Sequence, residues 1–143
     1  MSTFSAGQPA AVRQPYQKHS HLDWEYPTEA FDFVVSNQTM HHFWPEQKVQ
    51  VYRNILCALK PSGAYLESDF YVEAIHAEQY RRRYQAIMAQ AREQAEAGRF
   101  HIDIPNTIEV QKQLLLNAGF RSVEVLEEHI RLRWSGGILK ARK

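Results

Sequence analysis

At 143 residues the chain has the length of a single domain, large enough to bury a core but short for a complete doubly wound α/β fold. Its contents of 44% hydrophobic and 23% charged residues are ordinary for a soluble globular protein. A formal net charge of +1 excludes a strong global field that would attract nucleic acid or an anionic membrane. No run of about 18 apolar residues occurs and no secretory signal pattern opens the chain, so we expect neither a membrane span nor export. The single cysteine, Cys57, cannot form an internal disulfide, which favours the cytoplasm, and we expect it to be a small buried hydrophobe.

The beginning of the chain, residues 1–27, is expected to precede the folded domain, which we place at residues 28–143. Residues 1–14 have no helical or strand period and are typical of a mobile leader. Residues 16–27 are polar and aromatic, and either a short edge strand or a loop would suit them.

The centre of the chain is a strand, a helix and a second strand within residues 31–69. Residues 31–35 are almost continuously apolar and predict a strand buried on both faces of a parallel sheet. Pro45 suits the first helical position, and Lys60-Pro61-Ser62-Gly63 ends the helix before a short strand at residues 64–68. The apolar residues of the helix recur at helical spacing: Val49, Tyr52, Leu56 and Leu59. The unit is therefore the right-handed βαβ element of a layered α/β fold.

A long helical pattern follows over residues 72–97, with Gly98 as its expected end. The basic run at residues 81–83 is best explained as a solvated helix face, and a lid over a substrate is the alternative.

The last helix is expected to begin at Asn106, as its N-cap, and to end at Gly119. Alternating apolar residues then predict two antiparallel strands joined near residues 127–129. Gly136-Gly137 predicts a bulge or bend in the second of these strands.

The central unit resembles the fourth strand, following helix and fifth strand of class I S-adenosylmethionine-dependent methyltransferases. The segments that carry this resemblance are Phe31-Asp32-Phe33-Val34-Val35-Ser36, Met40-His41-His42-Phe43, Tyr52-Arg53-Asn54-Ile55 and Ala58-Leu59-Lys60-Pro61-Ser62-Gly63. Residues 114–123 and 130–143 look like the last helix, sixth strand and closing antiparallel strand of that family. The resemblance implies a partial Rossmann-like α/β sheet of parallel strands with a terminal antiparallel pair and flanking helices.

The family resemblance also implies where a site would lie, because ligands of open α/β sheets bind beyond the carboxyl ends of the strands. It implies S-adenosylmethionine as the methyl donor and a small molecule as the acceptor. The residues implied are catalytic His41 and His42, donor-binding Asp23, Ser36 and Asn37, and acceptor-binding Asp69, Tyr71 and Tyr80. A histidine could remove a proton from the acceptor, but each histidine could equally cap the loop and pack against its aromatic neighbours.

One half of the family pattern is missing from these residues. The family carries a glycine-rich turn after its first strand, whereas the glycines here are Gly7, Gly63, Gly98, Gly119, Gly136 and Gly137, none in a Gly-x-Gly after an apolar strand. Without the neighbouring first strand, residues 31–36 would form a bare apolar edge. We expect the amino-terminal segment, a second copy of the chain or another polypeptide to cover this edge.

Two other functions are also compatible with the sequence. His19, His21 and Asp23 would face the same way in a strand and resemble part of a metallo-β-lactamase-type motif, but Trp24 stands where that motif needs histidine, so we expect no metal. The stronger rival is a truncated or non-catalytic methyltransferase-like module, or one half of a split enzyme.

Overall fold

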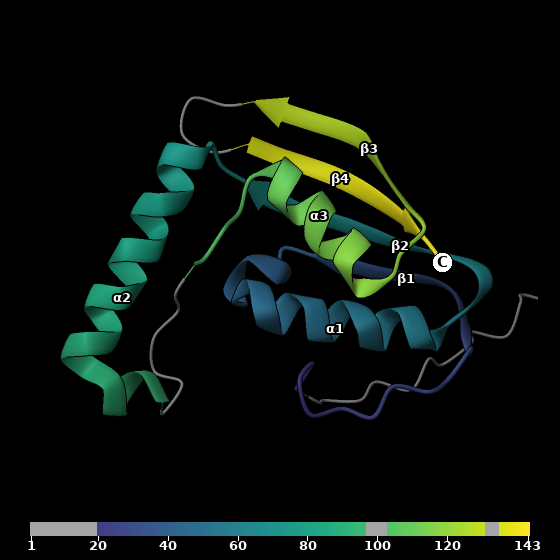
Figure 1. Ribbon diagram of the computed structural model, residues 1–143, viewed down its shortest axis with the longest axis horizontal. Helices are drawn as coiled ribbons and strands as arrows, with labels where there is room; N and C mark the ends of the chain where they lie inside the picture. Colours follow the sequence, from purple (N-terminus) through teal and green to yellow (C-terminus); the bar gives the residue numbers. More distant parts are fainter. Residues whose placement is uncertain (1–19, 97–102, 131–134) are drawn as a thin grey trace, which may run out of the picture.

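The computed structural model of the chain describes residues 20–96, 103–130 and 135–143, which form one mixed sheet with helices packed on it (Figure 1). The strands lie in the order β1-β2-β4-β3, with β1 parallel to β2 and the other two pairs antiparallel. Figure 1 shows α1 and α3 side by side on one face, while α2 leans away from the sheet. The elements are β1 (Phe31–Asn37), a 3-10 turn η1 (Met40–His42), α1 (Pro45–Ala58), β2 (Leu59–Tyr71), α2 (Ala74–Glu96), α3 (Ile108–Ala118), β3 (Ser122–Ile130) and β4 (Ser135–Arg142).

The predicted βαβ unit is confirmed. Pro45 occupies the start of α1, and the Gln47 Oε1 atom accepts a hydrogen bond of 3.0 Å from the Trp44 amide, which closes the first turn. Helix α1 ends at Ala58, as expected from the breaker sequence after it. The second strand is longer than predicted, because pairing with β1 and β4 on both sides extends β2 over Leu59–Tyr71.

The core lies between the sheet and the α1–α3 layer. Tyr52 of α1, Leu115 of α3, and Tyr65 and Leu139 of the sheet each have 0% of their surface exposed. Helices α1 and α3 also pack on each other, so the two apolar helix faces predicted from the sequence meet over the central strands.

Strand β1 is an exposed edge of the sheet rather than a strand buried on both faces. Among the described residues it pairs with β2 alone. Val34 and Ser36 face α1, and Phe33 and Val35 on the opposite face are 63% and 65% exposed. The apolar sequence of β1 therefore lacks a cover within the described part of the chain, as expected for a strand without its neighbour.

The predicted join between the last two strands at residues 127–129 is wrong. Strand β3 runs through these residues to Ile130, and the connection falls at residues 131–134, outside the described part of the chain. The irregularity predicted at Gly136-Gly137 lies instead on β3, where Leu126 is the extra residue in the pairing with β4. Gly137 has a packing role, since a Cβ atom there would lie 3.0 Å from the Tyr71 ring.

The ends of the helices and the burial of Cys57 agree only in part with the predictions. Thr107, not Asn106, caps α3, with its hydroxyl accepting from the Val110 amide at 3.2 Å. Gly119 ends α3 with a φ of +113°, as predicted. Gly98 lies outside the described residues, and Cys57 is exposed on the outer face of α1 rather than buried. None of the described helices has the length and apolar content that a membrane crossing requires.

Candidate functional site

The polar residues predicted from the sequence meet at the carboxyl ends of the two parallel strands. The chain leaves β1 at Asn37 and passes directly into η1, and β2 ends beside it at Tyr71. This adjacency brings His41 to Asp69, as expected from the rule that parallel strands end at the same edge.

Asp69 holds η1 in place through its buried carboxylate. Its Oδ2 atom accepts from the backbone amides of Met40 and His41, at 2.8 and 3.2 Å. Its Oδ1 atom accepts from the Phe70 amide at 2.8 Å and lies 2.5 Å from the His41 Nδ1 atom. Because an ionised carboxylate only accepts hydrogen bonds, this contact is a hydrogen bond from the Nδ1 atom of His41, and the Nε2 atom is left to face Asp103.

Asp103 joins this pair from the segment before α3. Its Oδ1 atom lies 3.7 Å from the His41 Nε2 atom and 3.4 Å from the His42 Nδ1 atom. The Ile104 amide donates to the His41 carbonyl at 2.6 Å, which ties the Asp103 segment to η1. Sequence reasoning missed Asp103, because no local pattern relates it to a histidine pair some sixty residues earlier in the chain.

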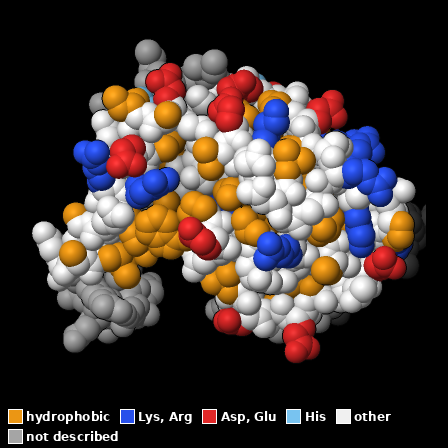
Figure 2. Space-filling view, viewed as in Figure 1, with side chains coloured by type: hydrophobic (Ala, Val, Ile, Leu, Met, Phe, Trp, Pro, Cys, Tyr) orange, Lys and Arg blue, Asp and Glu red, His pale blue; other side chains and the backbone are white. Residues whose placement is uncertain are grey.

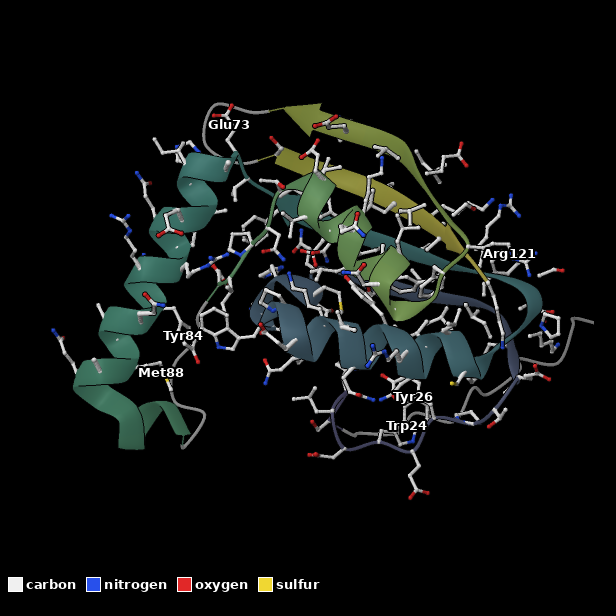
Figure 3. All side chains as sticks on the ribbon, in the orientation of Figure 1. Trp24, Tyr26, Glu73, Tyr84, Met88 and Arg121 are labelled. Atoms are coloured by element: carbon white, nitrogen blue, oxygen red, sulfur yellow. The ribbon has the colours of Figure 1, made fainter. Side chains whose placement is uncertain are left out.

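A groove of about 820 Å³ runs along β1 and opens beside the same edge. Its walls include Ser36, Thr39, Trp24 and Tyr26, with the apolar side chains of β1 and α1. Trp24 and Tyr26 have ring centroids 4.4 Å apart, and Figure 3 shows them beside α1 on the side away from α3. A flat ligand could stack on such an aromatic wall.

Two predicted donor contacts are not part of this groove wall. Asp23 is exposed in a turn, and Asn37 is exposed at the end of β1, where its carbonyl accepts from the Thr39 hydroxyl at 2.9 Å. Ser36 does line the groove, and its hydroxyl lies 2.6 Å from the Tyr65 hydroxyl.

The turn that contains Asp23 also removes the reason for the metallo-β-lactamase-type prediction. Residues 21–23 form a turn instead of a strand, so His21 and Asp23 do not share one strand face. His19 lies outside the described residues.

A buried carboxylate, Glu67 of β2, organises the polar core behind the site. It accepts hydrogen bonds from three tyrosine hydroxyls and one amide, at 2.6, 3.0, 3.1 and 2.7 Å: Tyr52, Tyr65, Tyr71 and Gln111 Nε2. Burial raises the pKa of Glu67, although the hydrogen bonds from Tyr52 and Gln111 oppose the shift. Sequence reasoning missed Glu67, because a glutamate in an alternating strand gives no sign that it faces inward.

Tyr71, which was predicted to contact an acceptor, has its side chain in this core. Only 2% of its surface is exposed, and its hydroxyl donates to Glu67 Oε1. Burial raises the pKa of the Tyr71 hydroxyl, which therefore stays protonated as a donor.

Lys48 of α1 is the second buried ionisable group that the sequence did not reveal. Its ammonium donates to Gln111 Oε1 at 3.2 Å, and only 1% of the residue is exposed. Burial lowers the pKa of Lys48 to about 8, while Glu67 and Asp69 act in the opposite direction.

Helix α2 flanks the site through an aromatic contact. The Trp44 ring packs edge-on against Tyr84 with centroids 4.5 Å apart, and Figure 3 shows Tyr84 and Met88 on the side of α2 that faces α1. Figure 2 shows hydrophobic side chains gathered where α2 meets the body, with acidic and basic groups interspersed over the rest of this face. Tyr80 is half-buried on α2 and lines neither of the two described pockets, the second of which has about 210 Å³ and includes Asp69.

Comparison with known proteins agrees with this architecture. Residues 5–63 match the family model of a methyltransferase domain. The sequence matches no curated protein. An S-adenosylmethionine-dependent methyltransferase from Methanosarcina mazei is 18% identical, with a TM-score of 0.60 over 95% of this chain and 72% of that one.

Two further structures were solved with ligands. The 1,6-didemethyltoxoflavin-N1-methyltransferase of Burkholderia thailandensis, with bound 1,6-didemethyltoxoflavin and S-adenosylhomocysteine, is 18% identical, with a TM-score of 0.59 over 86% of this chain and 48% of that one. Phosphoethanolamine N-methyltransferase 2 of Haemonchus contortus, with phosphomonomethylethanolamine and S-adenosylhomocysteine, is 13% identical. Its TM-score is 0.56 over 87% of this chain and 36% of that one.

The chain spans only 35–42% of the length of three other matched structures. The order β1-β2-β4-β3 corresponds to the fourth, fifth, closing and sixth strands that the sequence resemblance implied. The shared fold agrees with that resemblance: the chain has the fold of S-adenosylmethionine-dependent methyltransferases, and the family model covers less than half of its residues.

Proposed function

We propose that the chain takes part in the transfer of a methyl group from S-adenosylmethionine to a small-molecule acceptor. The observation that carries the proposal is the His41–Asp69 pair at the carboxyl ends of the parallel strands in a methyltransferase fold. Met40, next to His41, lines the groove along β1, and Asp69 lines the second pocket. Ligand-bound proteins of this fold, such as those from B. thailandensis and H. contortus, support the assignment of donor and acceptor class.

The acceptor side of the reaction is assigned to η1 and the end of β2. As the acceptor oxygen or nitrogen bonds to the methyl carbon, the carbon–sulfur bond breaks and its electron pair stays on sulfur, which gives S-adenosylhomocysteine. The acceptor proton passes to an imidazole, and His41 suits this role because Asp69 holds its ring with Nε2 as the acceptor atom. His42, which is only half-buried, and Tyr80 on α2 remain candidate contacts with the acceptor. Alignment of the two substrates supplies much of the rate in such a transfer.

The donor side is assigned to the groove along β1. Ser36 supplies a hydroxyl, and Trp24 and Tyr26 supply aromatic surface for the adenine ring. Asp23 and Asn37 lie close to these groups in the sequence and remain proposed donor contacts. No Gly-x-Gly turn occurs in the 143 residues, so these groups form one wall of a donor site.

The other wall is assigned to polypeptide that pairs with the bare edge of β1. Phe33 and Val35 expose an apolar face that such a segment would cover, whether it comes from a second copy, a partner chain or sequence beyond these residues. The same exposed edge favours the second candidate function, a non-catalytic module that binds another protein through β1.

Replacing His41 by alanine tests the acceptor side. In a fusion that supplies donor-binding segments ahead of residue 20, we expect formation of S-adenosylhomocysteine from a panel of small phenols, carboxylic acids and amines to fall by about 10²- to 10⁴-fold, because the proton acceptor is lost. Glu124→Ala is the control, since Glu124 is exposed on β3 and lines neither of the two described pockets. Equal rates in the His41→Ala variant, or no product from any acceptor class while the donor is bound, would contradict the proposal.

A further inference from the structure

We propose that His41, His42 and Asp103 form a binding site for a divalent transition-metal ion. Each residue offers one ligand atom, and the three atoms lie within 4.8 Å of one another. They form the only such group of three or more among residues 20–96, 103–130 and 135–143.

The distances between the Asp103 oxygen and the two histidine nitrogens match those between the ligands of a metal ion. At 3.7 and 3.4 Å, the two nitrogen–oxygen distances exceed the usual hydrogen-bond range of about 2.7–3.2 Å. Bonds of about 2.1 Å to a tetrahedral zinc ion place its ligand atoms about 3.4 Å apart. Both nitrogen–oxygen distances to Asp103 are therefore close to the ligand–ligand distances of a zinc centre. A modest side-chain shift would bring the two imidazole nitrogens to a similar separation.

Asp69 orients the His41 ring. The Nδ1 atom of His41 contacts Asp69, and its Nε2 atom faces the Asp103 carboxylate. A carboxylate that holds the far nitrogen of a metal-bound histidine is also the usual support for such a ligand, and it fixes which nitrogen binds the metal.

The support around the ligands is rigid. Asp69 is itself held by three backbone amides, those of Met40, His41 and Phe70. The Phe70 ring packs on His41 with centroids 4.3 Å apart, and the Ile104 amide anchors the neighbour of Asp103 to the His41 carbonyl. A preformed arrangement of this kind lowers the cost of ordering ligands when the ion binds.

Two imidazoles and one carboxylate suit a first-row divalent transition ion such as zinc, with a coordination position left for water or substrate. The site deepens the proposed function without depending on it. A bound ion would take the lone pair of His41 and would itself lower the pKa of an acceptor hydroxyl that it binds, so the proton would leave to solvent instead of to the imidazole.

Zinc and cobalt binding test the site directly, and neither readout needs donor or acceptor. We expect Zn²⁺ to raise the melting temperature of the full chain saturably. Co²⁺ should give the visible absorption of a low-coordinate site with nitrogen and oxygen ligands. The half-exposed residues allow variants that spare the core, and His42→Ala and Asp103→Asn should each weaken binding at least about tenfold.

His129→Ala is the matched control, because His129 is exposed on β3 and is not one of the three ligands. Binding should be unchanged in this variant. Absence of a melting shift, equal affinity in Asp103→Asn and His42→Ala, or loss of binding in the control would overturn the metal site. Loss of the metal site would leave the methyl-transfer proposal in place, and failure of methyl transfer would leave the metal readouts unaffected.

Discussion

Replacing Glu67 by alanine is expected to lower the free energy of unfolding by about 3–5 kcal/mol, because it removes the shared acceptor of a fully buried polar network. Three tyrosine hydroxyls and the Gln111 amide would lose Glu67 as an acceptor, although Tyr65 keeps its contact with Ser36 and Tyr52 keeps its contact with Gln111. Each group that is left buried and unsatisfied costs about 1–3 kcal/mol, and the losses are not additive. Since small domains have about 5–15 kcal/mol of stability in total, this one change should bring the chain close to unfolding at room temperature.

Urea unfolding followed by circular dichroism measures this effect, with two variants for comparison. Glu67→Gln keeps a side-chain oxygen as acceptor and should cost clearly less than alanine. Glu124→Ala, on the exposed part of β3, should stay within about 0.5 kcal/mol of the wild type. A Glu67→Ala protein as stable as the Glu124→Ala protein would show that the network does not stabilise the fold.

Raising the pH from about 7.5 to 9.5 is expected to stabilise the wild-type chain relative to a Lys48→Met variant by about 2 kcal/mol. Burial lowers the pKa of Lys48 to about 8 from 10.5. Between these two values the unfolded chain binds the proton and the folded chain does not, so stability rises with pH at up to about 1.4 kcal/mol per unit. Below pH 8 both states hold the proton, and the cost of the buried charge is present in full.

The comparison with Lys48→Met isolates this group, because that variant keeps the length of the side chain and removes the charge. The upper limit of the range matters, since burial raises the pKa values of Tyr52 and Tyr65. Above pH 10 the unfolded chain loses tyrosine protons that the folded chain retains, and stability then falls. Guanidinium unfolding midpoints at several pH values give the difference, and a difference that stays flat from pH 7.5 to 9.5 would contradict a neutral buried Lys48.

The βαβ unit could be predicted from the sequence because its signals are local. Pro45 predicts where α1 starts, and the apolar residues of α1 predict which face of the helix is buried. The apolar run of β1 predicts a strand. The same dependence on local signals explains why the join between the last two strands was predicted wrongly. Alternation continues smoothly through residues 127–129 of β3, and whether a strand continues or turns depends on its pairing with β4.

The candidate site was predictable only in part. The position of β1 and β2 in a parallel pair brings His41 and Asp69 to one edge, so a general rule of α/β sheets was enough to find them. Asp103, Glu67 and Lys48 could not be found in this way. Their importance comes from which distant side chains surround them after folding, and no spacing in the sequence records those contacts.

Tyr71 shows that position along a strand is not enough. It is the last residue of β2, at the predicted edge, and strand alternation turns its side chain into the core, where Gly137 of β4 leaves room for the ring. A residue at the end of a strand is therefore a site candidate only when its alternation also points it toward the edge.

Calorimetric titration of S-adenosylmethionine tests the central claim most directly, namely that these residues supply the acceptor edge and one wall of the donor site. Two samples are needed: the 143-residue chain, and a fusion in which the part of the B. thailandensis N1-methyltransferase outside the matched 48% precedes residue 20. Cooperative melting first establishes that each sample is folded. We predict binding weaker than about 1 mM for the chain alone and micromolar binding for the fusion, a gain of about 4 kcal/mol. Micromolar binding by the chain alone, or a folded fusion that does not bind the donor, would contradict the account.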